Sequence, residues 1–131
     1  MPVRKEIDLN RERAVLADPT AREGARRQAA DEIAWIDRIN AGKKISLSAL
    51  HLGPTVLLHM PGELFVEYQL AAQTMSPSET VCMAAYGDYG PGYIGTAKSY
   101  PEGGYETALY VSRTAPEVEG NLLDAIESLL E

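Results

Sequence analysis

Carboxylates and phenols that could bind a cation or a polar ligand gather between residues 61 and 106 of this 131-residue chain. A glutamate and several tyrosines beside glycine-rich backbone could ligate a hard or borderline cation, or they could hold a polar ligand through hydrogen bonds. The residues lie in three short motifs, which are Pro61-Gly62-Glu63, Gly92-Tyr93-Ile94 and Gly103-Gly104-Tyr105-Glu106. Asp88 and Tyr89 are further candidates in the same stretch, as is Glu106.

Each of these residues also has a structural interpretation, and the residues alone leave both open. Glu63 in a first helical turn would interact favourably with the helix dipole. Tyr93 and Tyr105 could pack their rings across a sheet edge and leave their hydroxyls in water. His51 and His59 favour structural or surface roles, because neither has a second histidine at metal-binding spacing such as i+4 on a helix.

The elements expected before these motifs begin with a helix. Residues 1–18 are charged and lack a sustained period, which predicts an extended lead-in. A helix is expected to open at Asp18-Pro19-Thr20, with Thr20 and Glu23 as a capping box, and to end at Gly42. An alternating strand is then expected over 45–49, and a turn at Gly53-Pro54 leads to a more buried strand over 55–60.

A strand–helix–strand unit over 55–86 is expected to carry the motifs. A helix should begin near Glu63, and the apolar run at 80–86 predicts a strand that is buried on both faces, with Cys82 in the core. The unit implies a parallel pair with a crossover helix. Because ligands of open α/β sheets bind beyond the carboxyl ends of the strands, Glu63, Asp88, Tyr89 and Tyr93 should share one rim.

The remaining stretches are a long loop and a last helix. Residues 87–104 are rich in glycine and tyrosine, which favours a functional loop over disorder. A helix opening at 114–117 should continue to the end of the chain. The whole, residues 1–131, is expected to be a single α/β domain or domain fragment, with a small mixed or parallel sheet and flanking helices over 19–131.

Charge distribution narrows the classes of ligand. Residues 1–44 hold 10 Lys and Arg against 8 Asp and Glu, whereas residues 45–131 hold 2 against 11. The acidic part argues against nucleic acid or an anionic membrane, which need basic residues, and suits a cation or a neutral ligand. The arginines of the first helix alternate with acidic residues and are expected to form a solvated face; they are Arg22, Arg26, Arg27 and Arg38, interleaved with Glu23, Asp31, Glu32 and Asp37.

The cysteine count and the hydropathy of the chain do not determine its cellular compartment or its association with a membrane. Cys82 is the one cysteine, so no internal disulfide can form. No apolar run approaches the roughly 18 residues of a transmembrane helix, and the amino terminus lacks the apolar region of a signal peptide. Localisation therefore stays open.

The order and spacing of the three motifs resemble the neutral/alkaline (non-lysosomal) ceramidase family. The run HMPGELFVEYQ is followed by an apolar strand and then by DYGPGYIGTAKSYPEGGYE. Members of that family show a strand ending in Pro-Gly-Glu, a later Tyr-(Ile/Val), and a Tyr-Glu about a dozen residues further on. The similarity extends over Thr20 to Leu130, and its most specific part is 61–106.

The resemblance implies a zinc-dependent hydrolase of the amide bond of ceramide, which gives sphingosine and a fatty acid. Glu63 and Tyr93 match the zinc-binding glutamate and tyrosine of the family. Tyr105 matches a catalytic tyrosine that points at the scissile carbonyl and would stabilise the oxyanion. The zinc of such an enzyme lowers the pKa of its bound water to about 7.

Departures from the family indicate a portion of the catalytic domain. The family's zinc also binds two histidines from motifs upstream of everything present here, and neither His51 nor His59 matches them. Asp88 stands where the family usually has asparagine. We therefore expect the carboxy-terminal part of the catalytic domain, inactive without an amino-terminal half, with ceramide, another N-acyl amide or a bacterial lipid as substrate. The alternative is a non-catalytic α/β module that binds a ligand or partner; an exposed sheet face, and hence an oligomer, is expected in both cases.

Overall fold

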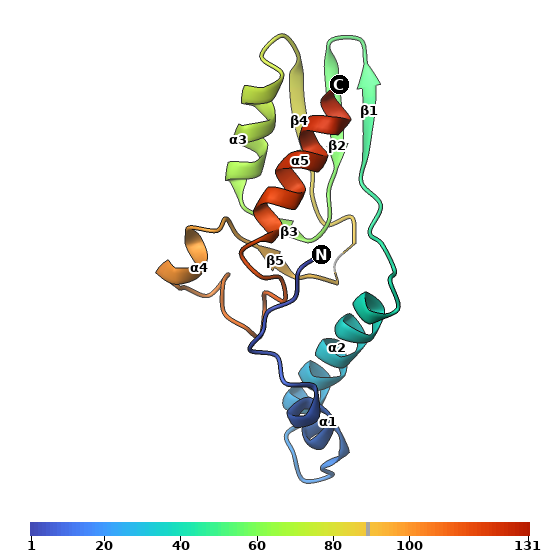
Figure 1. Cartoon of the computed structure of the whole chain (residues 1–131), viewed down its shortest axis with the longest axis vertical. Helices are drawn as coiled ribbons and strands as arrows, with labels where there is room; N and C mark the ends of the chain where they lie inside the picture. Colours follow the sequence, from blue (N-terminus) through green and yellow to red (C-terminus); the bar gives the residue numbers. More distant parts are fainter. Residues whose placement is uncertain (89) are drawn as a thin grey trace.

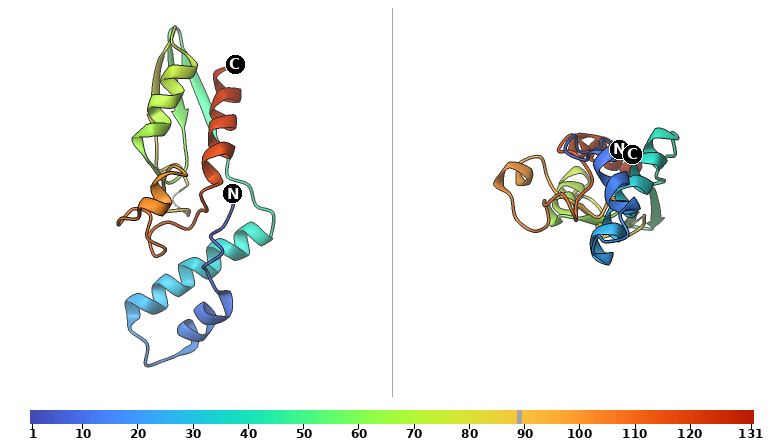
Figure 2. Two further views of the ribbon diagram at one scale, coloured as in Figure 1. Left: turned by 60° about the vertical axis from the view of Figure 1, so that its left-hand side comes forward. Right: turned by 90° about the horizontal axis from the view of Figure 1, so that it is seen from below.

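A computed structural model describes residues 1–88 and 90–131 and shows a small α/β fold (Figure 1). Within that part of the chain, the helices are α1 (Leu9–Ala17), α2 (Glu23–Asn40), α3 (Val66–Met75), α4 (Ser99–Glu102) and α5 (Val118–Leu130). The strands are β1 (Ser48–Leu52), β2 (Thr55–His59), β3 (Glu63–Leu64), β4 (Thr80–Ala84) and β5 (Tyr93–Ile94). Helices α1 and α2 lie at one end of the molecule, the three-stranded sheet with α3 and α5 at the other, and β3 and β5 between them (Figures 1 and 2).

The larger sheet has the strand order β1-β2-β4. Strand β1 is antiparallel to β2 across the turn at Gly53, and β2 is parallel to β4. Helix α3 makes the crossover between the two parallel strands, so the predicted strand–helix–strand unit is confirmed. The first predicted strand begins later than expected, at Ser48.

One face of this sheet forms the main core. Helices α3 and α5 contact each other and pack against the sheet. The fully buried members of this core come from both helices and from β2 and β4; they include Val56, Leu58, Tyr68, Ala72, Val81, Val118, Leu122 and Ile126. The prediction that β4 is buried on both faces is wrong, because both helices lie on the same side, and Cys82 is exposed on the other side.

The amino-terminal region differs from the expected extended lead-in. Residues 9–17 form α1, whose N-cap Asp8 accepts hydrogen bonds from the backbone N–H groups of Asn10 and Arg11. The residues before it hold a bridge between Val3 and Thr114 and a turn at Lys5 and Glu6. The sequence pattern of α1 is weakly apolar, and the helix is stabilised by its N-cap and by packing against α2.

Helix α2 forms where predicted but starts later. Thr20 donates a hydrogen bond from its hydroxyl to Asp18 at 2.7 Å, so the capping box with Glu23 is absent and the helix begins at Glu23 itself. The predicted end is confirmed, since Gly42 has φ 69° just past the last turn. Trp35 and Ile36 of α2 form a second, smaller core with Ile7.

The last helix, α5, forms as predicted, and its buried residues fall at the expected helical spacing. None of the helices in the described residues is long and apolar enough to cross a membrane.

Candidate functional site

Two short parallel strands bring Glu63 and Tyr93 together. A helix starts near Glu63 as predicted, but α3 begins three residues later, so Glu63 lies on β3 and not in a first helical turn. Glu63 and Tyr93 are register partners in the pairing of β3 with β5. The Glu63 N–H donates to the Gly92 carbonyl, and the Tyr93 N–H donates to the Val111 carbonyl, both at 2.9 Å.

Two glycines allow these backbone segments to approach so closely. Gly62 has φ 62°, and a Cβ there would lie 2.6 Å from the Gly92 carbonyl oxygen. Gly92 has φ 70°, and a Cβ there would lie 2.1 Å from the Val111 carbonyl oxygen. Both positions combine a backbone conformation that favours glycine with a lack of space for any side chain. The glycines of the motifs thus set the position of the glutamate and the tyrosine that follow them.

The side chains of this pair also meet. The Tyr93 hydroxyl donates a hydrogen bond to the Glu63 carboxylate, and this bond is the main cause that raises the pKa of Tyr93 to about 12. Desolvation by burial and the negative charge of Glu63 act in the same direction, as do Tyr105 and Tyr86. A carboxylate and a phenol thirty positions apart in sequence therefore meet through a hydrogen bond at the end of the sheet.

Two more tyrosines extend the site. The Tyr105 ring meets the Tyr93 ring edge to face with centroids 5.9 Å apart, and it meets the Tyr110 ring in the same manner at 5.9 Å. Together with Glu63, Gly92, Val111 and Arg113, the three tyrosines line a cavity of about 170 Å³. Tyr105 is 56% exposed, so its hydroxyl group belongs to an open part of the site.

The other predicted site residues lie elsewhere. Asp88 does not line this cavity; its carboxylate pairs with Arg38, and its carbonyl accepts a hydrogen bond from Gly62 N–H at 3.1 Å. Glu106 is exposed outside the cavity lining. His51 and His59 are exposed on β1 and β2. The prediction for Tyr89 lies outside the described residues.

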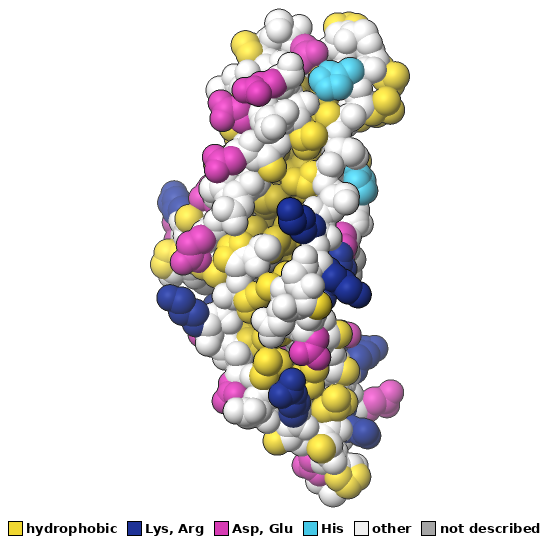
Figure 3. Space-filling view, turned by 45° about the vertical axis from the view of Figure 1, so that its right-hand side comes forward, with side chains coloured by type: hydrophobic (Ala, Val, Ile, Leu, Met, Phe, Trp, Pro, Cys, Tyr) yellow, Lys and Arg dark blue, Asp and Glu magenta, His cyan; other side chains and the backbone are white. Residues whose placement is uncertain are grey.

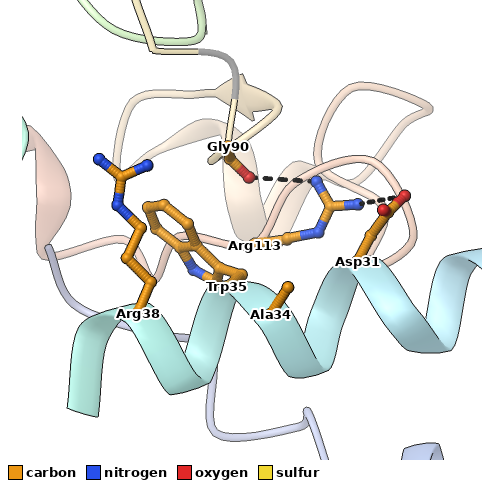
Figure 4. Close-up of a pocket in the computed structure, with 6 residues that line it drawn as sticks. All are labelled: Asp31, Ala34, Trp35, Arg38, Gly90 and Arg113. Carbon is orange, nitrogen blue, oxygen red and sulfur yellow. Dashed lines mark hydrogen bonds and ion pairs between the residues drawn. The ribbon is translucent and has the colours of Figure 1, made fainter. Parts of the chain in front are cut away.

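A second pocket, of about 310 Å³, adjoins the first (Figure 4). Helix α2 provides Asp31, Ala34, Trp35 and Arg38, while Gly90 and Arg113 come from the opposite wall. The close-up shows the Trp35 ring between the two arginines. Arg113 lines both cavities, so the second pocket and the Glu63–Tyr93 site share one wall.

The charges in the second pocket are balanced within the chain. Both terminal nitrogens of Arg38 donate to the Asp88 carboxylate. Arg113, whose side chain is 12% exposed, donates to the Gly90 carbonyl at 3.3 Å and lies 3.8 Å from Asp31. These contacts fasten α2 to the segment that leads into β5. We call the set Asp31, Trp35, Arg38, Asp88 and Arg113 the arginine clamp.

The clamp corrects the prediction of a solvated face on α2. Arg22, Arg26 and Arg27 are exposed as expected, but Arg38 is tied to Asp88 across the molecule. Glu32 is buried and accepts a hydrogen bond from Gln28 at 2.8 Å. The alternation of charged residues correctly predicts solvent exposure for the outer turns of α2. It does not predict which turns pack against later segments of the chain.

A third cavity, of about 330 Å³, lies between α5 and the connection from α2 to β1. It is lined by Met1, Ile39, Gly42, Lys43, Lys44, Ile45, Leu47, Asn121 and Leu122. Hydrophobic side chains form a band along the long axis on the face of Figure 3. No chemically reactive side chain stands out in this lining, so it is a packing groove in this structure.

Sequence reasoning missed Tyr110 and Arg113. A signal existed for the arginine, because it is one of only two basic residues in the acidic stretch 45–131. An isolated arginine in an acidic stretch is expected to pair with a carboxylate or a carbonyl oxygen. Nothing in the sequence around Tyr110 indicated a role in the site, because only the fold brings its ring next to that of Tyr105.

Comparison of the chain with family models, with curated proteins and with solved structures found no match. The site therefore has to be interpreted from its own geometry and from the motif resemblance.

Proposed function

We propose that this chain is the carboxy-terminal portion of a zinc-dependent amidohydrolase similar to the neutral ceramidases, and that it is part of a larger α/β catalytic domain. Glu63 and Tyr93 would hold the metal, and Tyr105 would act on the scissile carbonyl. The single observation that carries the proposal is that Glu63 and Tyr93 are register partners whose side chains meet through a hydrogen bond. Ceramide or a related N-acyl amide would be the substrate.

Glu63 and Tyr93 would supply two of the four protein ligands of a zinc site. Carboxylate and phenol oxygens are suitable ligands for zinc, and structural or catalytic sites take three or four protein ligands. The residues described contain no group of three or more His, Cys, Asp and Glu that could hold a metal. Glu63 and Tyr93 thus account for two ligands, and an amino-terminal half would have to provide the two histidines.

The roles of the chain's own residues follow from their positions. Bound zinc would supply a water molecule with a lowered pKa. The Tyr93 hydroxyl, like any phenol, is protonated at neutral pH, and its raised pKa makes that proton harder for a metal to displace from the phenol oxygen. The Tyr105 hydroxyl, in an open part of the same cavity, is suited to donate to an oxygen on which negative charge develops.

The test of the metal pair is a zinc titration by calorimetry. Glu63→Gln and Tyr93→Phe should each weaken zinc binding roughly 100-fold or abolish it, because each removes one of two ligands. Glu67→Gln, an exposed glutamate in the first turn of α3, is the matched control and should bind zinc like the wild type. Unchanged metal content in both site variants would refute the metal site and favour the non-catalytic module.

The test of the portion hypothesis is an assay with a fluorogenic ceramide, with and without zinc. The chain alone should show no turnover, since the ligand set is incomplete. Robust zinc-dependent hydrolysis by the isolated chain would contradict the need for an amino-terminal half.

A further inference from the structure

The β1-β2-β4 sheet has one face that no helix of the described residues covers. The alternation along each strand places nine side chains on this outer face: Ser48, Leu50 and Leu52 of β1, Thr55, Leu57 and His59 of β2, and Thr80, Cys82 and Ala84 of β4. The register puts Leu50, Leu57 and Cys82 in one row across the three strands. Leu50 and Leu52 are 54% and 55% exposed.

None of the nine residues is Asp, Glu, Lys or Arg, although those types make up 24% of the chain. A partner for this face also has to be free of charge at the centre, because a charge pressed against the Leu50–Leu57–Cys82 row would lose its hydration without gaining a counter-ion. The chain itself presents such a surface, namely the same face of a second copy. Two copies, each with a formal charge of −7, can meet there without bringing like charges together.

The edge of the sheet favours face-to-face stacking over sheet extension at β4. The Val81 carbonyl accepts hydrogen bonds from the side-chain amides of Gln69 and Gln73 of α3, at 2.6 and 3.2 Å. These two glutamines occupy a backbone acceptor that another strand would need, and such covering of an edge hinders strand addition. The outer face, in contrast, is open along all three strands.

We propose that this chain forms a twofold homodimer by stacking the outer faces of two β1-β2-β4 sheets, with Cys82 at the centre of the interface. Stacked sheets pack about 10 Å apart, so the side chains of the two leucine–cysteine rows interdigitate. A twofold contact uses the same patch on both copies, which this uncharged face allows. The inference is independent of the zinc proposal, because it uses no residue of the Glu63–Tyr93 site.

The test measures the mass of the chain by sedimentation velocity over a wide concentration range. The wild type should shift from monomer to dimer as concentration rises. Leu50→Asp should weaken dimerisation about 100-fold, since the new charge enters a twofold interface twice. Leu70→Asp, an equally exposed leucine on α3, is the control and should dimerise like the wild type.

Cys82 provides a second readout that needs no core substitution. Its rate of reaction with a soluble disulfide reagent should fall as the wild-type concentration rises, and stay constant for Leu50→Asp. Glu63→Gln should dimerise normally, which separates failure of the zinc proposal from failure of this one. A wild type that stays monomeric at all concentrations, with a constant Cys82 reaction rate, would overturn the dimer and assign the face to a different partner.

Discussion

The arginine clamp and the Glu63–Tyr93 site lie on two sides of Arg113, yet they differ in how their polar groups are balanced. In the clamp, each guanidinium faces a carboxylate of the same chain, with Arg38 against Asp88 and Arg113 near Asp31. In the site, a carboxylate and a phenol face each other, and the phenol donates a hydrogen bond to the carboxylate. In the first arrangement each charge has a counter-ion within the chain, although Trp35 Nε1 and the Nε atoms of Arg38 and Arg113 have no hydrogen-bond partner among the described residues. In the second, the negative charge of Glu63 faces a neutral phenol, and this is the pair that we propose as a cation site.

This difference assigns separate tasks to neighbouring residues. The clamp holds the backbone around Gly90 against α2, and β5 begins only three residues later. The clamp thereby helps to position Tyr93 relative to Glu63, and Arg113 is its one member that also lines their cavity.

The largest effect is expected from a change that breaks both regions at once, Gly92→Ala. A Cβ at this position would collide with the Val111 carbonyl, so the pairing of β3 and β5 has to shift, and the free energy of unfolding should fall by about 3 kcal/mol. Urea denaturation measures the loss. Zinc binding should disappear together with the stability.

A matched control separates backbone strain from the collision. Gly42 has φ 69°, close to that of Gly92, but nothing lies within 4 Å of its Cβ position. Gly42→Ala should therefore cost only the left-handed strain, about 1 kcal/mol. Equal losses in the two variants would show that close approach at Gly92 contributes nothing.

A smaller effect should isolate the clamp from the site. The Arg38 and Asp88 side chains are 32% and 29% exposed, so their pair is partly screened by solvent. Arg38→Gln should lower the free energy of unfolding by about 1 kcal/mol. The zinc affinity of the folded variant should stay unchanged, because neither residue lines the Glu63–Tyr93 cavity.

The control for this variant is Arg13→Gln on α1. Arg13 lies 3.8 Å from Asp37, and both side chains are 58% exposed. No measurable change in urea denaturation is expected there. A zinc affinity that falls in Arg38→Gln but not in Arg13→Gln would mean that the clamp belongs to the site after all.

The same contrast explains how far the sequence alone predicts this protein. Apolar runs and turn residues sufficed for β2, β4, α5 and the parallel crossover, because each depends on a local pattern and one buried face. The proximity of Glu63 and Tyr93 was also predictable, because both lie just beyond strand ends, whereas the role of Gly62 and Gly92 in their close approach was not. The clamp was not, because Arg38 and Asp88 are fifty positions apart and only the fold decides which arginine of α2 turns inward.

The arrangement of helices on one or both faces of the sheet was the other feature that local sequence patterns do not predict. An apolar strand such as β4 reads the same whether helices cover one face or both. Exposure of Cys82 therefore follows from the placement of α3 and α5 on one side, and this is decided by the whole chain. The short strand β3 escaped prediction for a similar reason, since two residues show no periodicity.

The smallest predicted effect is a pH dependence that reports on the hydrogen bond between Tyr93 and Glu63. Free tyrosine loses its proton near pH 10, whereas the hydrogen bond to Glu63 raises the pKa of Tyr93 to about 12. The folded state therefore holds this proton more tightly than the unfolded state. Its contribution to stability is fully present below pH 10 and is lost as pH rises towards 12.

Absorbance of tyrosinate, recorded as the difference between wild type and Tyr93→Phe, should show one phenol that ionises near pH 12. In Glu63→Gln the carboxylate acceptor and its charge are both gone, so the same difference should move towards pH 10. Arg38→Gln should leave it in place, since the clamp holds the backbone and does not contact the phenol. If the titration of Tyr93 is the same in Glu63→Gln as in the wild type, the two side chains are not hydrogen-bonded. The contrast between ion pairs in the clamp and a carboxylate–phenol pair in the site would then lose its central contact.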